Sequence, residues 1–281
     1  MKLLGIDIGG TNIRVGLVEG NELTKVESML VRKDSSENEV FDDLFSLIRK
    51  FDYEKVEGIG VGVPSIVDVE KGIVYQVQNI PSWKKVHLKE ILESNFKIPT
   101  YINNDANCFA VGEKYFGNVK DYKNIVGLII GTGLGAGVII NNKLYEGANC
   151  GAGEFGEIAY KDKNYEYYCS GQYFLNEIGI SGKELAKKAA DKDSSALEIY
   201  RNYGENLGNA IKMIMYALDP EVIVLGGSVS KSFLYFKEQM WKSIKRFTYS
   251  KSAEKIKITV SEKENIAILG AAALYLNAKN A

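Results

Sequence analysis

The amino-acid sequence predicts an α/β fold built from two similar halves, and three observations support this prediction. Apolar, strand-like segments alternate with segments of helical spacing along nearly the whole chain. Glycines cluster between neighbouring strands instead of being evenly spread. A pattern of strand, Gly-Thr turn, strand, turn and strand occurs at the N-terminus and again after residue 124. We therefore expect two related lobes with a cleft between them.

The first half begins with a hairpin and continues as alternating strands and helices. Strands are expected at Lys2–Ile8, Asn12–Val18, Thr24–Leu30, Gly58–Val63 and Thr100–Asn103. Helical spacing is present in Glu37–Phe51, His87–Phe96 and Ala106–Phe116. This alternation is typical of an α/β lobe, to which we assign residues 1–118.

The second half repeats this order. Strands are expected at Ile125–Ile130, Ala136–Ile140, Lys143–Tyr145, Glu221–Leu225 and Ile256–Val260, with a turn at Gly131–Gly135. Long helical patterns cover Ser195–Leu218 and Ile266–Asn277. The polar stretch Asn118–Lys123 predicts the boundary. The second lobe is then 119–265, and the closing helix, 266–281, is expected to pack back on the first lobe.

Composition excludes several classes of protein. The chain has 35 basic and 36 acidic residues, a formal net charge of −1, which argues against nucleic acid or a membrane surface as partner. No apolar run reaches the roughly 18 residues of a membrane span, and the N-terminus opens directly on a strand, so a cytoplasmic protein is expected. The three cysteines show no zinc or disulfide spacing, and the one histidine, His87, is expected near a helix start. Any general base is therefore a carboxylate.

The loop Asp7-Ile8-Gly9-Gly10-Thr11-Asn12 is a candidate phosphate site. A glycine turn between strands can offer backbone N–H groups to a phosphate, and Thr11 and Asn12 add donors. Asp7, at the strand end, can hold Mg²⁺ through water, and Arg14 adds positive charge. The loop lacks the lysine of a P-loop. The alternative is a plain hairpin.

Two later glycine clusters strengthen the phosphate interpretation. Gly131-Thr132-Gly133-Leu134-Gly135 repeats the first loop about 120 residues on, and the pair predicts a clamp on a polyphosphate from both lobes. Gly226-Gly227 ends a buried strand, where a flat base could lie against bare backbone. A strand-to-helix turn is the alternative for this third cluster.

Two polar segments supply candidates for catalysis and substrate binding. In Asn103-Asn104-Asp105-Ala106-Asn107, Asp105 is the candidate general base, and a helix N-cap is the alternative interpretation of the segment. The glycine-rich stretch Gly147–Glu157 contains Glu154 and Glu157, whose carboxylates could accept hydrogen bonds from sugar hydroxyls. A surface loop with solvated glutamates is the alternative here.

These motifs together resemble the ROK sugar kinases, in the actin-like/hexokinase (ribonuclease H-like) ATPase superfamily, over nearly the whole chain. The resemblance implies ATP and Mg²⁺ as cofactors, with phosphate loops at Asp7–Asn12 and Gly131–Gly137 and an adenosine loop at Leu225–Gly227. It implies that Asp105 is the base and that the sugar is bound by Asn104, Glu154, Glu157 and Glu177, with Ser65, Asn79 and the polar segment Ser65–Gln78 contributing. It also implies a homodimer.

The sequence departs from this family at its structural zinc. The family pattern has three cysteines and one histidine as zinc ligands, and the matching positions here are Tyr168, Ser170, Leu175 and Glu157. We therefore expect no zinc site, and packing of the Tyr and Phe side chains of residues 165–174 in its place. The zinc-free pattern resembles some bacterial N-acetylmannosamine kinases.

The resulting hypothesis is phosphorylation of the 6-hydroxyl of a hexose or N-acetylhexosamine, with N-acetylmannosamine as the first candidate and glucose as the alternative. Two other classes were weighed. A sugar-sensing repressor would need an N-terminal DNA-binding segment, for which the phosphate loop at Asp7 leaves no room. An ATP-driven conformational protein of the actin kind would leave Asn104-Asp105 and the glutamates unexplained.

Overall fold

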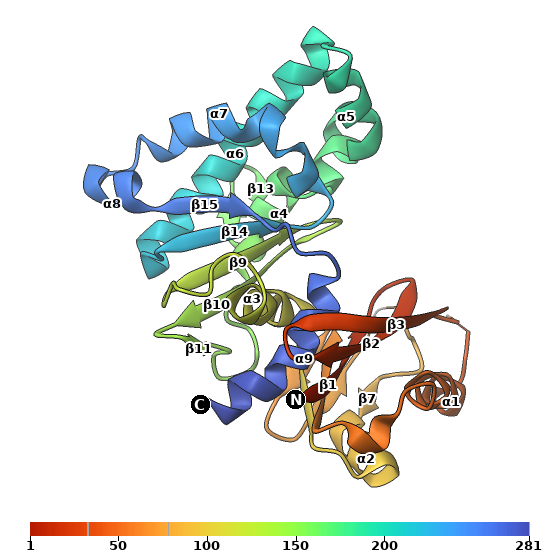
Figure 1. Ribbon diagram of the computed structural model, residues 1–281. Coiled ribbons are helices and arrows are strands. Elements are labelled where there is room, and N and C mark those ends of the chain that lie inside the picture. The colour runs from red at the N-terminus through yellow and green to blue at the C-terminus, as the bar shows by residue number, and fades with distance from the viewer. Residues whose placement is uncertain (33, 78, 281) are drawn as a thin grey trace. The chain divides into compact units, whose positions relative to one another are not determined.

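The computed structural model describes residues 1–32, 34–77 and 79–280 and has the α/β architecture that the sequence predicts (Figure 1). The chain divides into two compact units. Unit 1 comprises Met1–Asp121, Gly137–Ala152 and Glu262–Ala281, and unit 2 comprises Tyr122–Ala136 and Gly153–Ser261. The lobe boundaries expected from the sequence differ from these units at residues 119–121, 137–152 and 262–265 and stay a prediction.

The main sheet of unit 1 has the strand order β3-β2-β1-β4-β8. Its strands are β1 (Lys2–Ile8), β2 (Asn12–Glu19), β3 (Glu22–Leu30), β4 (Gly58–Val63) and β8 (Thr100–Asn104). The first three strands form antiparallel pairs, whereas β4 is parallel to both β1 and β8. Every residue of β4 is buried, as expected for a central strand that is covered on both faces.

Four helices of unit 1 accompany this sheet. They are α1 (Glu37–Ile48), α2 (Leu88–Phe96), α3 (Asp105–Tyr115) and α9 (Ile266–Lys279). A capping box between Ser36 and Glu39 starts α1, and His87 occupies the N-cap position of α2. Figure 1 shows that α9, from the end of the chain, lies beside β1 from its beginning.

A small three-stranded sheet in unit 1 was not predicted. It has the order β5-β6-β7 and consists of β5 (Ile66–Asp68), β6 (Ile73–Tyr75) and β7 (Lys85–Val86). Its strands are only two or three residues long, too short for an alternating pattern to be recognised. The turn between β5 and β6 contains Gly72 at a φ of 62°.

The second large sheet has the order β11-β10-β9-β14-β15. Its strands are β9 (Ile125–Ile130), β10 (Leu134–Ile140), β11 (Lys143–Leu144), β14 (Val222–Gly226) and β15 (Lys257–Val260). As in the first sheet, the earlier strands of the repeat lie on one side and two later parallel strands on the other. The internal repeat in the sequence is therefore present at the level of sheet topology. One boundary was wrong, because β10 begins at Leu134 and leaves only Gly131–Gly133 in the turn.

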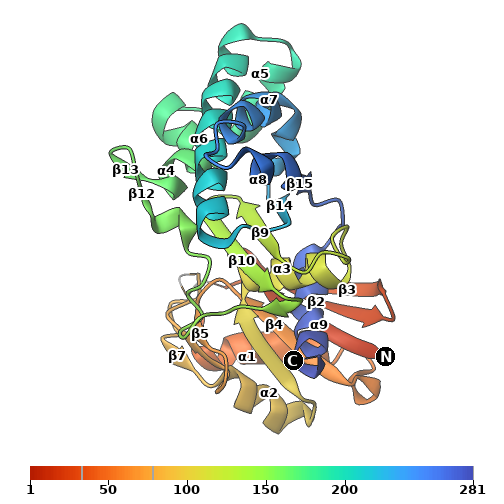
Figure 2. The ribbon, with the colours of Figure 1, turned by 90° about the vertical axis from the view of Figure 1, so that its left-hand side faces the viewer.

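Helices supply most of the remainder of unit 2. They are α4 (Tyr165–Cys169), α5 (Gly182–Ala190), α6 (Ser194–Leu218), α7 (Phe233–Ile244) and α8 (Ser250–Lys255). Figure 2 shows the long α6 beside α7. A two-stranded ribbon, β12 (Ala159–Tyr160) and β13 (Lys163–Asn164), precedes α4, and the π-helical segment Phe174–Ile178 follows it.

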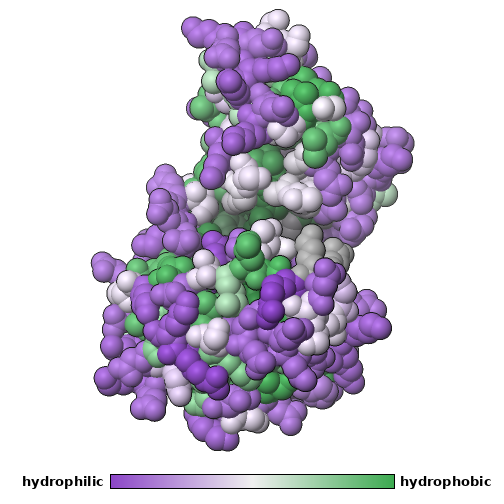
Figure 3. Space-filling view, turned by 90° about the vertical axis from the view of Figure 1, so that its right-hand side faces the viewer, coloured by the Kyte–Doolittle hydropathy of each residue, from purple (hydrophilic) through white to green (hydrophobic). Residues whose placement is uncertain are grey.

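Each unit has its own hydrophobic core. The core of unit 1 contains Ile6, Leu44 and Val61, and that of unit 2 contains Leu207 and Phe236. Hydrophilic residues cover most of the molecular face drawn in Figure 3. Among the described residues, no helix combines the length and the apolar character that a membrane span requires.

Candidate functional site

Three neighbouring strands of unit 1 bring the predicted acidic residues to one edge of the sheet. In the parallel register, Asp7 of β1 lies opposite Gly62 of β4, and Gly62 lies opposite Asn103 of β8. Asn104 and Asp105 follow directly, at the junction of β8 and α3. Ligands of α/β proteins commonly bind beyond the carboxyl ends of parallel strands. The structure therefore places Asp7 and Asp105 at an edge that suits a ligand.

The first glycine loop exposes unused backbone donors at the same edge. The N–H of Gly9 donates to the carbonyl of Asn12 at 2.9 Å and closes the turn. The N–H groups of Gly10 and Thr11 donate to no group in the described part of the chain, so both are available to an anion. A Cβ atom on Gly10 would lie 2.9 Å from Nδ2 of Asn79, so Asn79 lies against this loop.

Arg14 orients the Asp7 carboxylate. The two residues face each other across the β1–β2 hairpin, and Nε of Arg14 donates to Oδ2 of Asp7 at 3.0 Å. Asp7 is 7% exposed, and its Oδ1 has no partner among the described residues. A single available carboxylate oxygen fits the predicted water-mediated contact with Mg²⁺, which prefers oxygen ligands and keeps several waters.

The segment for which the sequence left a catalytic role and a helix N-cap open lies at the start of α3. Asn104 is the N-cap of α3, because its Oδ1 accepts the N–H of Ala106 at 2.8 Å. Its Nδ2 donates to the carbonyl of Ser65 at 3.3 Å, which joins two predicted sugar-binding residues. Asp105 is the first residue of α3, and its Oδ1 also lies within hydrogen-bonding distance of the Ala106 N–H, at 2.9 Å. The positive end of the helix dipole favours the ionised carboxylate that a general base needs.

The side chain of Ser65 is committed to the small sheet. Its Oγ donates to the carbonyl of Tyr75, at the end of β6. The hydroxyl can therefore offer a ligand only its acceptor lone pairs. Gln78, the last residue of the predicted polar segment, lies outside the described residues.

The second glycine loop, in unit 2, resembles the first in detail. The N–H of Gly131 donates to the carbonyl of Gly133 at 3.0 Å, and the N–H groups of Thr132 and Gly133 have no acceptor in the described ranges. Glu166 of α4 supports the loop by accepting the N–H of Leu134 at 2.9 Å. The N–H of Gly171 donates to the carbonyl of Gly131 at 2.8 Å. Two unused donors on a supported turn are what an anion site requires.

Gly227 lies directly against this second loop. Its φ is 83°, and a Cβ atom there would lie 2.3 Å from the carbonyl oxygen of Ile130, the residue before Gly131. Only glycine fits both the conformation and the space. Gly226 ends β14, so the structure brings the predicted adenosine loop and the second phosphate loop together within unit 2.

The predicted sugar-binding glutamates lie in two places in unit 2. Glu154 precedes a short 3₁₀ turn and Glu157 is its last residue. Glu157 accepts a hydrogen bond from Nδ2 of Asn164 at 3.3 Å. Partial burial, together with the Glu157 and Glu166 carboxylates, raises the pKa of Glu154. Glu177 lies in the π-helical segment and accepts a hydrogen bond from the hydroxyl of Tyr167 at 2.5 Å. π-Helical turns often occur at functional sites.

The four positions that match zinc ligands in the family differ in environment. Ser170 is fully buried, Tyr168 is half-buried, and Glu157 and Leu175 are exposed. Within residues 1–32, 34–77 and 79–280, no three His, Cys, Asp or Glu side chains are grouped so that they could hold a metal ion.

Aromatic side chains and one lysine pack around Tyr168. Tyr160 stacks on Tyr165 with ring centroids 4.4 Å apart, and it meets Tyr168 edge to face. The Lys161 ammonium lies 4.6 Å from the Tyr168 ring centroid and donates to Oδ1 of Asn206 in α6 at 2.8 Å. A hydrogen bond to Asp162 raises the pKa of Tyr168 to about 12. Lys161 thus links the β12–β13 ribbon to α6, as a structural metal could.

Replacing Lys161 with Met is expected to lower the free energy of unfolding by about 1–2 kcal/mol. The variant loses the cation–π contact with the Tyr168 ring and the charged hydrogen bond to buried Asn206. Urea denaturation measures this. Lys163→Met is the matched control. Lys163 is on the same ribbon, but its ammonium lies 5.9 Å from the Tyr167 ring centroid, farther than Lys161 from the Tyr168 ring. Equal effects of the two variants would contradict a specific role for Lys161.

No individual role was predicted for Asn103, Glu146 or Cys150, which the structure joins by hydrogen bonds. Asn103 donates from Nδ2 to Glu146 at 2.5 Å, and its Oδ1 accepts from Sγ of Cys150 at 3.3 Å. Asn103 directly precedes Asn104, and its side chain is 1% exposed in the structure. The sequence alone does not reveal this burial. Glu146 and Cys150 are 43 and 47 residues away from Asn103 in sequence. Cys150 lies in the glycine-rich stretch Gly147–Glu157, but no local pattern indicates that either residue contacts Asn103.

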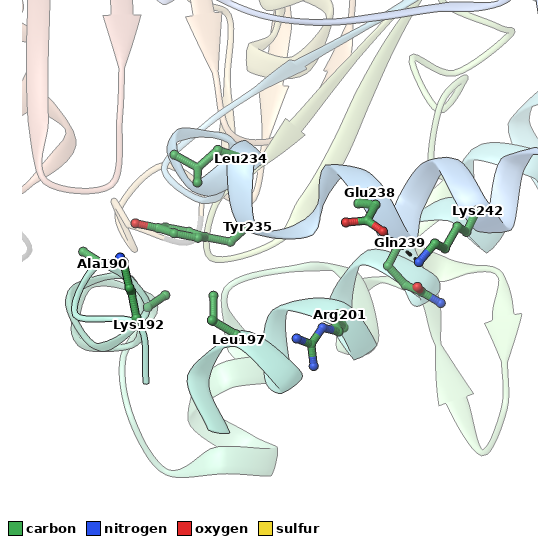
Figure 4. A pocket seen from close by; sticks show the side chains of 10 residues that line it. Ala190, Lys192, Leu197, Arg201, Leu234, Tyr235, Glu238, Gln239 and Lys242 are labelled. Atoms are coloured by element: carbon green, nitrogen blue, oxygen red, sulfur yellow. Dashed lines mark ion pairs between the residues drawn. The ribbon is translucent and has the colours of Figure 1, made fainter. Parts of the chain in front are cut away.

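A cavity of about 440 Å³ elsewhere in unit 2 contains none of the predicted site residues. Figure 4 shows Leu197 of α6 facing Tyr235 of α7 across it, with Arg201 further along α6. Glu238 and Lys242, also on α7, pair with each other at 2.8 Å. The cavity is therefore separate in sequence and in lining from the predicted loops.

Comparison with known proteins decides the family. The sequence pattern of the ROK family matches residues 3–278. The chain belongs to the ROK family. Among relatives of this ROK protein, the N-acetyl-D-glucosamine kinase of Aliivibrio fischeri is 32% identical over 266 residues, covering 83% of this chain and 86% of the relative. The xylose repressor of Bacillus subtilis is 27% identical over 297 residues, covering 98% of this chain and 77% of the repressor.

A solved structure confirms the predicted fold. The ROK family glucokinase from Streptomyces griseus, in complex with glucose and AMPPNP, superimposes with a TM-score of 0.80 at 25% identity, covering 98% of this chain and 99% of the glucokinase. This ROK protein therefore has the actin-like/hexokinase ATPase fold. Kinases and repressors both occur among its relatives. The kinase relatives support the interpretation of this chain as a sugar kinase.

Proposed function

We propose that this ROK protein transfers the γ-phosphoryl group of ATP to the 6-hydroxyl of a hexose or N-acetylhexosamine. The observation that carries the proposal is the register of unit 1, in which Asp7 and Asn103 flank Gly62 at the carboxyl ends of three parallel strands. Asp105 follows two residues after Asn103 and is the proposed general base. It would take the proton from the attacking hydroxyl as the phosphoryl group is transferred.

The nucleotide is assigned to the glycine loops. The N–H groups of Gly10 and Thr11 in unit 1, and of Thr132 and Gly133 in unit 2, are the proposed phosphate donors. The loop Gly226–Gly227 is proposed to contact the adenosine. When Mg²⁺ is bound, it neutralises phosphate charge, and Oδ1 of Asp7 would hold it through water.

N-Acetylmannosamine is the proposed sugar, with glucose as the alternative. Asn104, Glu154, Glu157 and Glu177 are proposed to orient it, and Ser65 and Asn79 are proposed to contribute to its binding. Support comes from the carboxylates, which can accept hydrogen bonds from several sugar hydroxyls. Further support comes from Glu157, which stands where the family pattern has a zinc-binding histidine. The relative from Aliivibrio fischeri is named for an N-acetylated sugar.

A coupled ADP-release assay over hexoses and N-acetylhexosamines tests the proposal. With ATP and Mg²⁺ present, N-acetylmannosamine is expected to raise the rate of ADP release most, with glucose as the main comparison. Sugar phosphate should accumulate in equal amount to ADP. If glucose is the best substrate, the sugar assignment fails and the kinase assignment stands. If no sugar changes the rate, the kinase assignment fails.

The repressor relative gives a second candidate, a sugar-responsive regulator. Such a protein would bind sugar without consuming ATP. The same assay, combined with calorimetry of sugar binding, separates the two: sugar binding without ADP release would favour the regulator. Asp105 argues for the kinase, because a regulator has no need of a general base at this edge of the sheet.

A further inference from the structure

A cavity of about 450 Å³ opens in unit 1 between the small sheet and the loop after β11. Its walls include Ile66, Asp68 and Tyr75 on one side and Glu146, Ala148 and Cys150 on the other. The volume is many times the roughly 30 Å³ that one water molecule occupies. The cavity therefore has room for a sizeable chemical group.

Glu146 is anchored by one carboxylate oxygen only. Its Oε1 accepts a hydrogen bond from Nδ2 of Asn103 at 2.5 Å. Its Oε2 has no partner in the parts of the chain that the structure describes, although the side chain is half-buried and lines the cavity. Burial raises the pKa of this carboxyl, and the Asn103 amide acts in the opposite direction. The arrangement presents one fixed, unused acceptor to the cavity.

Asn103 fixes the direction in which this acceptor points. Its Oδ1 accepts hydrogen bonds from the Asn104 N–H at 2.8 Å, from Nδ2 of Asn107 at 2.9 Å and from Sγ of Cys150 at 3.3 Å. With these donors on Oδ1, the amide nitrogen is left for Glu146. Asn103 is therefore a buried link between the cavity wall and the segment that contains Asp105.

The loop that bears Glu146 has a costly backbone conformation. Cys150 has a φ of 57°, in the left-handed region that favours glycine, and its Sγ contacts both Asn103 and Asn107. In the same cluster, Oδ1 of Asn107 is buried and has no hydrogen-bond partner among the described residues. Such conformations persist where surrounding contacts over-determine them, and they are frequent at ligand clamps. The contacts of Cys150 with Asn103 and Asn107 therefore hold this part of the loop in one conformation at the cavity wall.

The chemistry of the walls indicates what the cavity accepts. Ile66 is 66% exposed and Ala148 is exposed, so apolar surface remains to be covered next to the Glu146 acceptor. A hydroxyl group would satisfy the acceptor but would cover no apolar surface. An N-acyl group offers an N–H donor and an apolar acyl carbon on one substituent.

We propose that Glu146 is a specificity-determining residue that selects sugars with an N-acylated amine, by accepting the amide N–H on Oε2 while the acyl carbon contacts Ile66 and Ala148. This inference rests on the proposed function, since it concerns the sugar of the same site. It assigns the discrimination between amino sugars and simple hexoses to a residue outside the motifs of the sequence.

Glu146→Gln tests the proposal. Glutamine keeps an oxygen for the Asn103 hydrogen bond, but it can present a donor in place of the free acceptor. We expect the affinity for N-acetylmannosamine, measured by calorimetry, to fall by about 10–100-fold, whereas that for mannose changes by less than about threefold. The values of kcat/KM should follow the same pattern, mainly through KM. Glu90→Gln, a change of an exposed carboxylate on α2 that is not part of the cavity wall, should leave both affinities unchanged.

Two results would overturn the proposal: equal losses for both sugars in Glu146→Gln, which indicate a general structural role, or no loss for either. The proposed function fails separately, when the wild-type protein releases no ADP with any sugar. Calorimetry still decides the role of Glu146 in that event, because sugar binding does not depend on turnover.

Discussion

Asp105→Asn is expected to lower kcat by about 10²–10⁴-fold, the usual contribution of a positioned general base. Asparagine has nearly the same shape as aspartate and keeps an oxygen near the Ala106 N–H, which now lies 2.9 Å from Oδ1 of Asp105. The start of α3 should therefore be preserved, because Asn104 supplies the N-cap. What the variant loses is the capacity to take a proton from the attacking hydroxyl.

Steady-state kinetics together with calorimetry checks this expectation. The loss should appear in kcat, while the dissociation constant of the sugar changes by less than about threefold, because the amide still makes hydrogen bonds. Asp42→Asn, a change of an exposed carboxylate on α1, should leave both quantities unaltered. A wild-type kcat in Asp105→Asn would remove this residue from the role of base. A parallel loss of sugar affinity and kcat would instead indicate a binding role.

The large elements of the fold could be predicted because their signals are local. Buried strands such as Gly58–Val63 are continuous apolar runs, and the helix Ser194–Leu218 has regular apolar spacing. The small sheet could not be predicted, because its strands are stabilised by hairpin pairing and by packing against other elements. Helix α7 was missed although Phe236, Met240 and Ile244 have helical spacing and are buried. That signal was present in the sequence.

The candidate site likewise has one part that the sequence predicts and another part that it does not. The glycine loops, Asn104 and Asp105 are contiguous motifs whose chemistry can be interpreted from residue types. Contacts between distant segments could not be foreseen, such as Asn79 against Gly10 or Glu146 against Asn103. They depend on which distant segments the completed fold brings together, and the register of β1, β4 and β8 is another result of the same kind. The same limit applies to Lys161, whose contact with Asn206 joins a short ribbon to a distant helix.

That register depends on close packing between α9 and the sheet, and it leads to the largest stability effect that we expect. A Cβ atom on Gly60 of β4 would lie 1.7 Å from the carbonyl oxygen of Ala271, and one on Gly5 of β1 would lie 2.0 Å from that of Ile268. The obstacles are backbone atoms of α9, which cannot rotate away as the end of a side chain could. An added methyl group must therefore displace the helix or the strand.

Gly60→Ala is accordingly expected to lower the free energy of unfolding by about 3–5 kcal/mol, a large part of the 5–15 kcal/mol typical of a domain. Urea denaturation measures the loss, and Gly151→Ala is the control. A Cβ atom on Gly151 meets no heavy atom within 4 Å, so that variant should change stability by less than about 0.5 kcal/mol. Similar stability of Gly60→Ala and wild type would show that α9 shifts freely on the sheet. Because Gly62, two residues further along β4, separates Asp7 from Asn103, such a shift would also leave the catalytic edge poorly defined.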